Sequence, residues 1–251
     1  MNEKEHWNKI GSNYNNEIFD VFKSDKNKKL PFYFKKHAHK NNTALDFGSG
    51  NGKSFPFLSP LFKRITAIDI SQQLIDQAKT RGYKNISFKQ MDLAKPNIKL
   101  PKVNFVFCCN VVMLPVIEKN YMMLRNIRNA LVKGGTCVIV LPALESSLFS
   151  SWRLIDLYRK EGKSVNKIPQ NEFAYFNGTK REILQGLIHI DGVATKHYSA
   201  LEIEVIFKNA GLSITALDKI NYNWNSELSS PPKWLKEPYP WDWLVECKRL
   251  K

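Results

Sequence analysis

Three glycines at alternate positions, Gly48, Gly50 and Gly52, follow the acidic residue Asp46. The run 43–47 just before them is mostly apolar, as in a buried parallel strand, and residues 53–61 can begin a helix. Glycine leaves no side chain between the backbone and a ligand, and it allows a sharp turn with positive φ. Free N–H groups at a helix start favour polar or anionic groups. The segment therefore predicts a binding loop for a nucleotide-like cofactor.

The spacing of these glycines argues against two common nucleotide classes. A dinucleotide-binding loop needs a third glycine where this chain has Lys53. A P-loop would need a glycine at Phe47, although Gly52, Lys53 and Ser54 match its end. Neither NAD nor ATP fits the loop well.

Polar residues follow the next three predicted strands. Asp69 lies near the end of the apolar run 65–70, where a carboxylate can accept hydrogen bonds from both hydroxyls of a ribose. Asp92 follows the predicted strand 86–90, and Asn110 follows the almost wholly apolar strand 103–109. Ligands of open α/β folds bind at the carboxyl edge of the sheet.

The glycine pattern Asp46-x-Gly48-x-Gly50-x-Gly52 resembles the first motif of the class I S-adenosylmethionine (SAM) methyltransferases. The resemblance covers residues 43–141 by motif and 199–247 by pattern. It implies an α/β fold with a doubly wound, mostly parallel sheet of seven strands and helices on both faces. It also implies that SAM is the cofactor, with S-adenosyl-L-homocysteine as its product, and no metal is expected. An Asp is usual in the family where Asn104 stands here.

The resemblance assigns roles in cofactor binding to particular residues. Asp69 resembles the ribose ligand, and Asp92 resembles the acceptor for the adenine amino group, although Asp92 could instead cap the following turn. Tyr14, on a predicted N-terminal helix, could reach the methionine end or serve packing alone. The expected cofactor contacts are Tyr14, Asp46, Gly48, Ser49, Gly50, Asn51, Gly52, Asp69, Ile70, Met91, Asp92, Leu93, Asn110 and Val111.

The pattern along the chain predicts one methyltransferase domain spanning residues 1–251. Helices in residues 1–42 would cover the cofactor site, and residues 43–142 and 197–251 would form the Rossmann-like core. Residues 143–196 exceed what the minimal fold needs. An insertion after the fifth strand would lie over the ligand-binding edge of the sheet, so we expect a substrate lid.

Methyl transfer to an O, N, C or S nucleophile is the implied reaction, most simply on a small molecule. Alignment of an activated sulfonium with its acceptor can supply up to about 7 to 11 kcal/mol, whereas a general base adds about 3 to 5 kcal/mol. No catalytic residue therefore needs to stand out. The candidates for a base or an acceptor contact are His189, His197, Tyr175 and Tyr198, and for each of them a structural role is the stronger alternative.

The formal net charge of +15 leaves a second class of function open. Lysines and aromatic residues alternate in the segment 23–40, which is either a solvated helix face or a phosphate-binding patch. RNA methylation through this segment is one alternative, and SAM binding without catalysis is another. The four cysteines lie in apolar runs without metal or redox spacing. We expect a cytoplasmic protein without a membrane span, and the oligomeric state is open.

Overall fold

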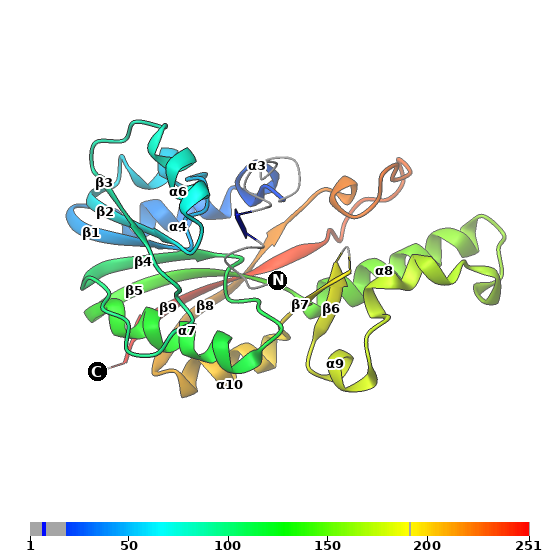
Figure 1. The fold of residues 1–251 in the computed structure, drawn as a ribbon. Coiled ribbons are helices and arrows are strands. Elements are labelled where there is room, and N and C mark those ends of the chain that lie inside the picture. The colour runs from blue at the N-terminus through cyan, green and yellow to red at the C-terminus, as the bar shows by residue number, and fades with distance from the viewer. Residues whose placement is uncertain (1–6, 9–18, 191, 251) are drawn as a thin grey trace.

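The computed structural model describes residues 7–8, 19–190 and 192–250, and its fold is shown in Figure 1. Most of the first predicted helix, including Tyr14, lies outside the described residues.

Seven strands form one sheet in the order β3-β2-β1-β4-β5-β9-β8, which confirms the predicted doubly wound α/β fold. Neighbouring strands from β3 to β5 run parallel, whereas β9 runs antiparallel to both β5 and β8. The strands are β1 (His39–Phe47), β2 (Phe62–Asp69), β3 (Ile86–Gln90), β4 (Val103–Cys109), β5 (Leu131–Pro142), β8 (Leu212–Asn221) and β9 (Trp241–Arg249).

The helices that cover the sheet begin and end at residues that the local chemistry favours. Ser71 caps α6 by accepting a hydrogen bond from the Leu74 N–H at 3.3 Å, as its position before an apolar helix predicts. The helices are α3 (Val21–Ser24), α4 (Lys29–His37), α5 (Phe55–Leu58), α6 (Gln72–Lys79), α7 (Ile117–Ala130), α8 (Leu144–Lys160), α9 (Lys180–Leu184) and α10 (Ala200–Asn209).

Ser199 caps α10, but Glu202 does not complete a capping box. The Ser199 hydroxyl accepts a hydrogen bond from the Glu202 N–H at 3.2 Å. The Glu202 carboxylate instead lies 2.7 Å from the ammonium of Lys196. The side chain of Lys196 is 1% exposed. A buried ammonium without a partner costs more free energy than an uncapped N–H group at a helix start, so Glu202 pairs with Lys196.

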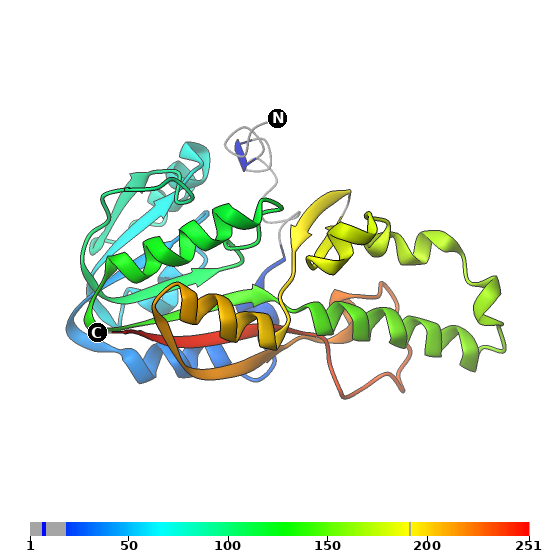
Figure 2. The same cartoon turned by 90° about the horizontal axis from the view of Figure 1, so that it is seen from below.

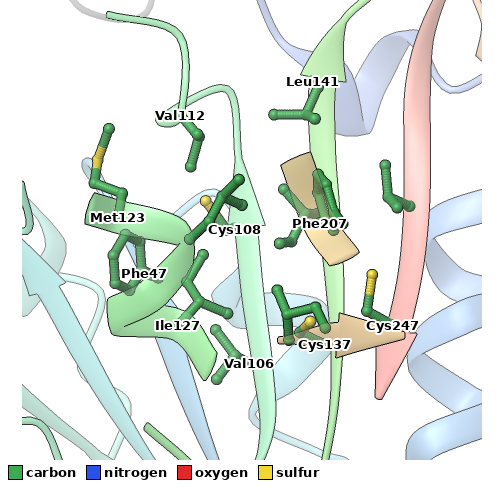
Figure 3. Close-up of a cluster of buried hydrophobic side chains, with 14 of the residues drawn as sticks. Phe47, Val106, Cys108, Val112, Met123, Ile127, Cys137, Leu141, Phe207 and Cys247 are labelled. Carbon is green, nitrogen blue, oxygen red and sulfur yellow. The ribbon is translucent and has the colours of Figure 1, made fainter. Parts of the chain in front are cut away.

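The two faces of the sheet bury separate apolar clusters, because successive side chains of a strand point to opposite faces. In β4, Val106 and Cys108 belong to the cluster that includes residues of α7 and α10. Figure 3 shows them beside Ile127 of α7. Phe105 and Phe107 of the same strand belong to the opposite cluster, which includes α4 and α5. The predicted near-continuous apolar strand is therefore buried from both sides.

The segment between β5 and α10 extends away from the sheet as an arm (Figures 1 and 2). It contains α8, the 3-10 helices η1 (Val165–Lys167) and η2 (Gln170–Phe176), α9, and the hairpin of β6 (Leu187–Ile190) and β7 (Val193–Lys196). The loop between β8 and β9, with η3 (Trp224–Ser226), packs against α8: the ring of Phe149 lies 5.7 Å from that of Trp224. None of the described helices is long and apolar enough to cross a membrane.

All four cysteines are free thiols within the described chain. Cys108, Cys137 and Cys247 are buried, and Cys109 is partly buried at the end of β4. Burial raises the pKa of the Cys109 thiol, so it stays protonated at neutral pH.

Candidate functional site

The glycine loop joins β1 to α5 and is held tightly to the end of β2. The N–H groups of Gly48 and Ser49 both donate to the Ile68 carbonyl at 2.9 Å. Gly48 has φ of +83°, and a Cβ there would overlap the side chain of Val111. Both the backbone conformation and the contact with Val111 therefore require glycine at this position. The loop thus brings the end of β1 against the segment that follows β4.

Asp69 is held at the end of β2 by two backbone N–H groups. Its carboxylate oxygens accept hydrogen bonds from Gly50 at 2.8 Å and Ser71 at 2.9 Å. Burial raises the pKa of Asp69, while these hydrogen bonds oppose the rise. The chain therefore fixes the orientation of this carboxylate before any ligand arrives.

Asp46, at the end of β1, is more deeply buried and is 2% exposed. The Ser54 hydroxyl donates to its Oδ2 atom. Burial raises the pKa of Asp46 to about 7, with a smaller contribution in the same direction from the charge of Asp69.

One cavity of about 900 Å³ opens at the carboxyl ends of β2 and β3, and we call it the β2–β3 cavity. The Asp92 carboxylate in its wall accepts a hydrogen bond from the Ala94 N–H at 2.9 Å, so Asp92 caps the turn that follows β3. Its walls include eight of the residues predicted to bind the cofactor, which are Gly48, Asp69, Ile70, Met91, Asp92, Leu93, Asn110 and Val111.

A second cavity, of about 820 Å³, lies between the sheet edge, the arm and the β8–β9 loop, and we call it the β8–β9 cavity. The arm contributes Ser146 of α8, Tyr175 of η2 and Ile188 of β6 to its walls. The sheet side contributes Asp46, Gly48, Ser49, Asn110, Tyr222, Trp241 and Asp242.

The two cavities share several walls, among them Gly48, Asn110 and Met113. Asn110 follows β4 with φ of +51°, a left-handed conformation that few residues other than glycine and asparagine adopt readily. Its Nδ2 donates to Asp242 Oδ2 at 3.2 Å. Asn110 thus turns the chain at the junction of the two cavities while its side chain contacts β9.

Asp242 begins β9 and accepts a second hydrogen bond, from the Tyr222 hydroxyl at 2.8 Å. Burial raises the pKa of Asp242 to about 6, and the hydrogen bonds from Tyr222 and Asn110 oppose that rise. This group is thus a carboxylate at neutral pH that gains a proton in mildly acidic solution.

Three of the predicted cofactor residues line neither cavity. The Gly50 N–H is used by Asp69, the Gly52 N–H donates to the Ser49 carbonyl at 2.9 Å, and the carbonyl of Asn51 accepts from Arg81 at 2.6 Å. Gly50, Asn51 and Gly52 therefore shape the loop in this structure, and direct contact with a cofactor stays a prediction for them. Tyr14 lies outside the described residues.

The four candidates for a base or an acceptor contact separate into two pairs. Tyr175 and His197 line the β8–β9 cavity, whereas Tyr198 and His189 line neither cavity. Tyr198 is fully buried in the core beside Lys196, whose ammonium lies 4.4 Å from its ring centre. Burial lowers the pKa of His197 to about 4, so this imidazole is neutral at pH 7.

Asp242 and Tyr222 were not predicted as site residues. The sequence places Asp242 inside a predicted apolar strand and Tyr222 in a loop rich in aromatic residues, and neither belongs to a motif. Asp242 lies 132 positions from the asparagine that binds it. Within the described part of the chain, no group of three or more His, Cys, Asp or Glu side chains could hold a metal ion.

Comparison with known proteins agrees with this geometry. Residues 44–135 match the model of a methyltransferase domain family. The chain is 27% identical over 174 residues to protein 235L of Invertebrate iridescent virus 6, which carries a provisional methyltransferase assignment. The match covers 67% of this chain and 62% of that protein, so the chain spans less than two thirds of its relative.

Two solved structures share the fold across most of their length. The N-methyltransferase NodS of Bradyrhizobium japonicum WM9, in complex with S-adenosyl-L-homocysteine, superposes with a TM-score of 0.61 at 13% identity, covering 100% of both chains. A SAM-dependent methyltransferase of Methanosarcina mazei superposes with a TM-score of 0.61 at 15% identity, covering 86% of this chain and 95% of its own. Residues 44–135 therefore resemble a methyltransferase domain, and the chain has the fold of these SAM-dependent methyltransferases, in agreement with the resemblance in its sequence.

Proposed function

We propose that this protein is a SAM-dependent methyltransferase that moves the sulfonium methyl group to an O, N, C or S nucleophile of a small molecule. The observation that carries the proposal is the meeting of two cavities at Asn110 and Gly48. One cavity has the fixed carboxylate of Asp69 in its wall, and the other is enclosed partly by the arm. A methyl donor bound in the β2–β3 cavity would present its sulfonium methyl group to a methyl acceptor bound in the β8–β9 cavity.

The residues present fit SAM. Asp69 would accept hydrogen bonds from the ribose hydroxyls, and Ile70, Met91 and Leu93 would form the apolar walls around adenine. Gly48 lines both cavities, so its backbone is open to a ligand there. Bound there, SAM supplies an activated methyl group, and the chain's own task is to orient the two reactants.

The arm, residues 143–196, would act as the substrate lid. Its α8, η2 and β6 contribute walls to the β8–β9 cavity, as a lid requires. By excluding water around the reacting groups, such a lid strengthens electrostatic interactions inside the cavity. Residues 1–42 would close the opposite side, where Trp7 lines both cavities.

An RNA acceptor is the alternative, and the position of the basic segment 23–40 argues against it. Lys29 is paired with Asp218 at 2.6 Å, and Lys36 with Glu246 at 2.7 Å. His37 at the end of α4 contacts Thr136 at 3.2 Å, near the start of the parallel part of β5. From Lys29 onward the segment therefore leads away from the carboxyl edge where the cavities lie.

The experiment that tests the proposal is calorimetric titration of SAM and S-adenosylhomocysteine into the purified protein. Micromolar binding of SAM that Asp69→Ala abolishes supports the cofactor site. The control is Asp76→Asn, at an exposed position of α6, which should leave binding unchanged. Turnover of SAM on a panel of small-molecule acceptors then separates an enzyme from a protein that only binds SAM. Absence of binding to the folded wild type would reject the proposed function, and salt-sensitive RNA binding would favour the alternative.

A further inference from the structure

The β8–β9 cavity has an acidic wall although the protein as a whole carries a formal charge of +15. Its acidic residues are Asp46, Asp242 and the exposed Glu227, and Lys53 is the single Lys or Arg among its described lining residues. The Lys53 ammonium is already 3.4 Å from Asp20. This local reversal of charge suits a ligand that carries a positive charge.

The acceptor atoms in this wall outnumber the donors that could satisfy them. Both hydrogen bonds to Asp242, from Tyr222 and Asn110, reach its Oδ2 atom, so Oδ1 accepts none from the described residues. The Oδ1 atom of Asn110 is buried and has no hydrogen-bond partner in the described chain. An alcohol brings one donor, whereas an ammonium brings up to three.

Aromatic rings form the walls around these oxygens. Tyr222, Trp241, Phe19 and Phe107 all line the cavity, and the ring of Phe19 lies 4.7 Å from that of Tyr222 in an edge-on arrangement. A cation that contacts the faces of such rings gains electrostatic attraction beyond what the carboxylate provides.

We propose that the methyl acceptor is an amine whose nitrogen is held by the carboxylate of Asp242, with Asn110 and Tyr222 positioning that carboxylate. This inference rests on the proposed function and names its substrate class. Asp242 takes the proton that leaves the acceptor nitrogen. The freed lone pair forms the new C–N bond with the methyl carbon, while the C–S bond breaks and its electron pair returns to sulfur as a thioether.

The position of Asn110 makes Asp242 better placed for this role than the other titratable groups of the cavity. Asn110 lines both cavities and contacts Asp242 directly, so the carboxylate lies beside the junction where donor and acceptor would meet. Burial raises the pKa of Asp46 to about 7, so Asp46 is partly protonated at neutral pH, and Glu227 is exposed. His197 already uses Nδ1 on the Thr195 carbonyl at 3.0 Å.

The test measures binding of matched fragments rather than turnover. Saturation-transfer NMR and competition titrations, with S-adenosylhomocysteine present, would compare benzylamine, benzyl alcohol and benzoate, and likewise phenethylamine, 2-phenylethanol and phenylacetate. We expect both amines to bind more tightly than their alcohols and carboxylates. Asp242→Asn should lower amine affinity by about 30-fold, since it removes one partner of a buried charge pair, and leave alcohol affinity unchanged. Asp76→Asn should change neither.

A pH series adds a readout that a purely structural role of Asp242 would not move. Amine affinity should fall as the pH drops through about 6, the pKa of Asp242, because the carboxylate loses its charge while the amine keeps its own. The groups that face Asp242 are Tyr222, Asn110, Glu227 and the Cys109 thiol. Tyr222→Phe removes a hydrogen bond that lowers this pKa, so the midpoint should move to higher pH.

Three outcomes would overturn the inference: amines that bind no better than alcohols, an Asp242→Asn variant with unaltered amine affinity, or a variant that loses amine and alcohol equally. If S-adenosylhomocysteine binds in the same samples, such an outcome rejects the amine acceptor and leaves the proposed function standing. If S-adenosylhomocysteine does not bind, the proposed function itself fails. If Asp242→Asn does not fold, the pH midpoint of Tyr222→Phe decides the question alone.

Discussion

Replacing Gly48 with alanine should destabilise the protein by about 2 to 5 kcal/mol. The new side chain must adopt φ of +83°, which costs about 1 to 2 kcal/mol for a residue other than glycine. Its Cβ must also displace the methyl groups of Val111, and overpacking of this kind costs about 1 to 3 kcal/mol. The two costs add because one concerns the backbone and the other the neighbour.

Gly82→Ala separates these two costs. Gly82 has a similar φ of +73°, but a Cβ there would meet nothing within 4 Å. It should therefore lose only the backbone part, about 1 to 2 kcal/mol. The difference between the two variants, about 1 to 3 kcal/mol, measures the contact between the glycine loop and the segment after β4.

Urea unfolding followed by circular dichroism measures both free energies of unfolding, with the slope of the transition as a check that the same surface is exposed. In the double variant Gly48→Ala with Val111→Ala, the smaller side chain should recover much of the steric cost. Equal losses for Gly48→Ala and Gly82→Ala would refute the close approach. So would a double variant whose costs simply add.

Three further predictions concern a turn, a buried acid and the core. Asp92→Ala should lower the free energy of unfolding by about 1 kcal/mol, because the hydrogen bond from the Ala94 N–H is lost. If Asp92 also binds adenine, calorimetry should show weaker SAM binding to this variant. An unchanged affinity for SAM would leave Asp92 with the turn role alone. Because the pKa of Asp46 is raised to about 7, the folded state binds more protons than the unfolded chain, so wild-type stability should fall by roughly 1 to 2 kcal/mol from pH 6 to pH 8. Asp46→Asn should flatten that fall in urea titrations at the two pH values, and an equal slope in both proteins would contradict the assignment. Phe34→Ala, at a fully buried ring, should lower the free energy of unfolding by about 3 to 5 kcal/mol. Phe32→Ala, at a ring 59% exposed, should lower it far less. Similar losses for the two variants would contradict the burial of Phe34 in α4.

Elements with strong local patterns were predicted well. The strands 86–90 and 103–109 have their predicted bounds, and Ser71 caps its helix as expected. These features depend on side-chain periodicity and on hydrogen bonds to nearby backbone groups, which neighbouring residues determine. Strand lengths were predicted less well. β1 begins at His39 and β5 at Leu131, because pairing with strands distant in sequence extends them beyond their apolar cores.

Ion pairing also escaped prediction. His37 lies in the lysine-rich segment 23–40, and its Nε2 lies 2.6 Å from Glu246 on β9. The Lys36 ammonium and the Thr215 hydroxyl contact the same carboxylate, at 2.7 Å each. These partners come from three separate parts of the chain, so no window of sequence contains the cluster.

By itself the sequence determined the fold class, the glycine loop and the position of Asp69, because each follows from short-range spacing within one strand, turn and helix. Only the tertiary structure decided the second cavity. Asn110 ends β4, Tyr222 follows β8 and Asp242 begins β9, and they meet because β5, β9 and β8 lie side by side with β9 reversed. That reversal brings the start of the last strand to the edge where the earlier strands end, which local spacing cannot express.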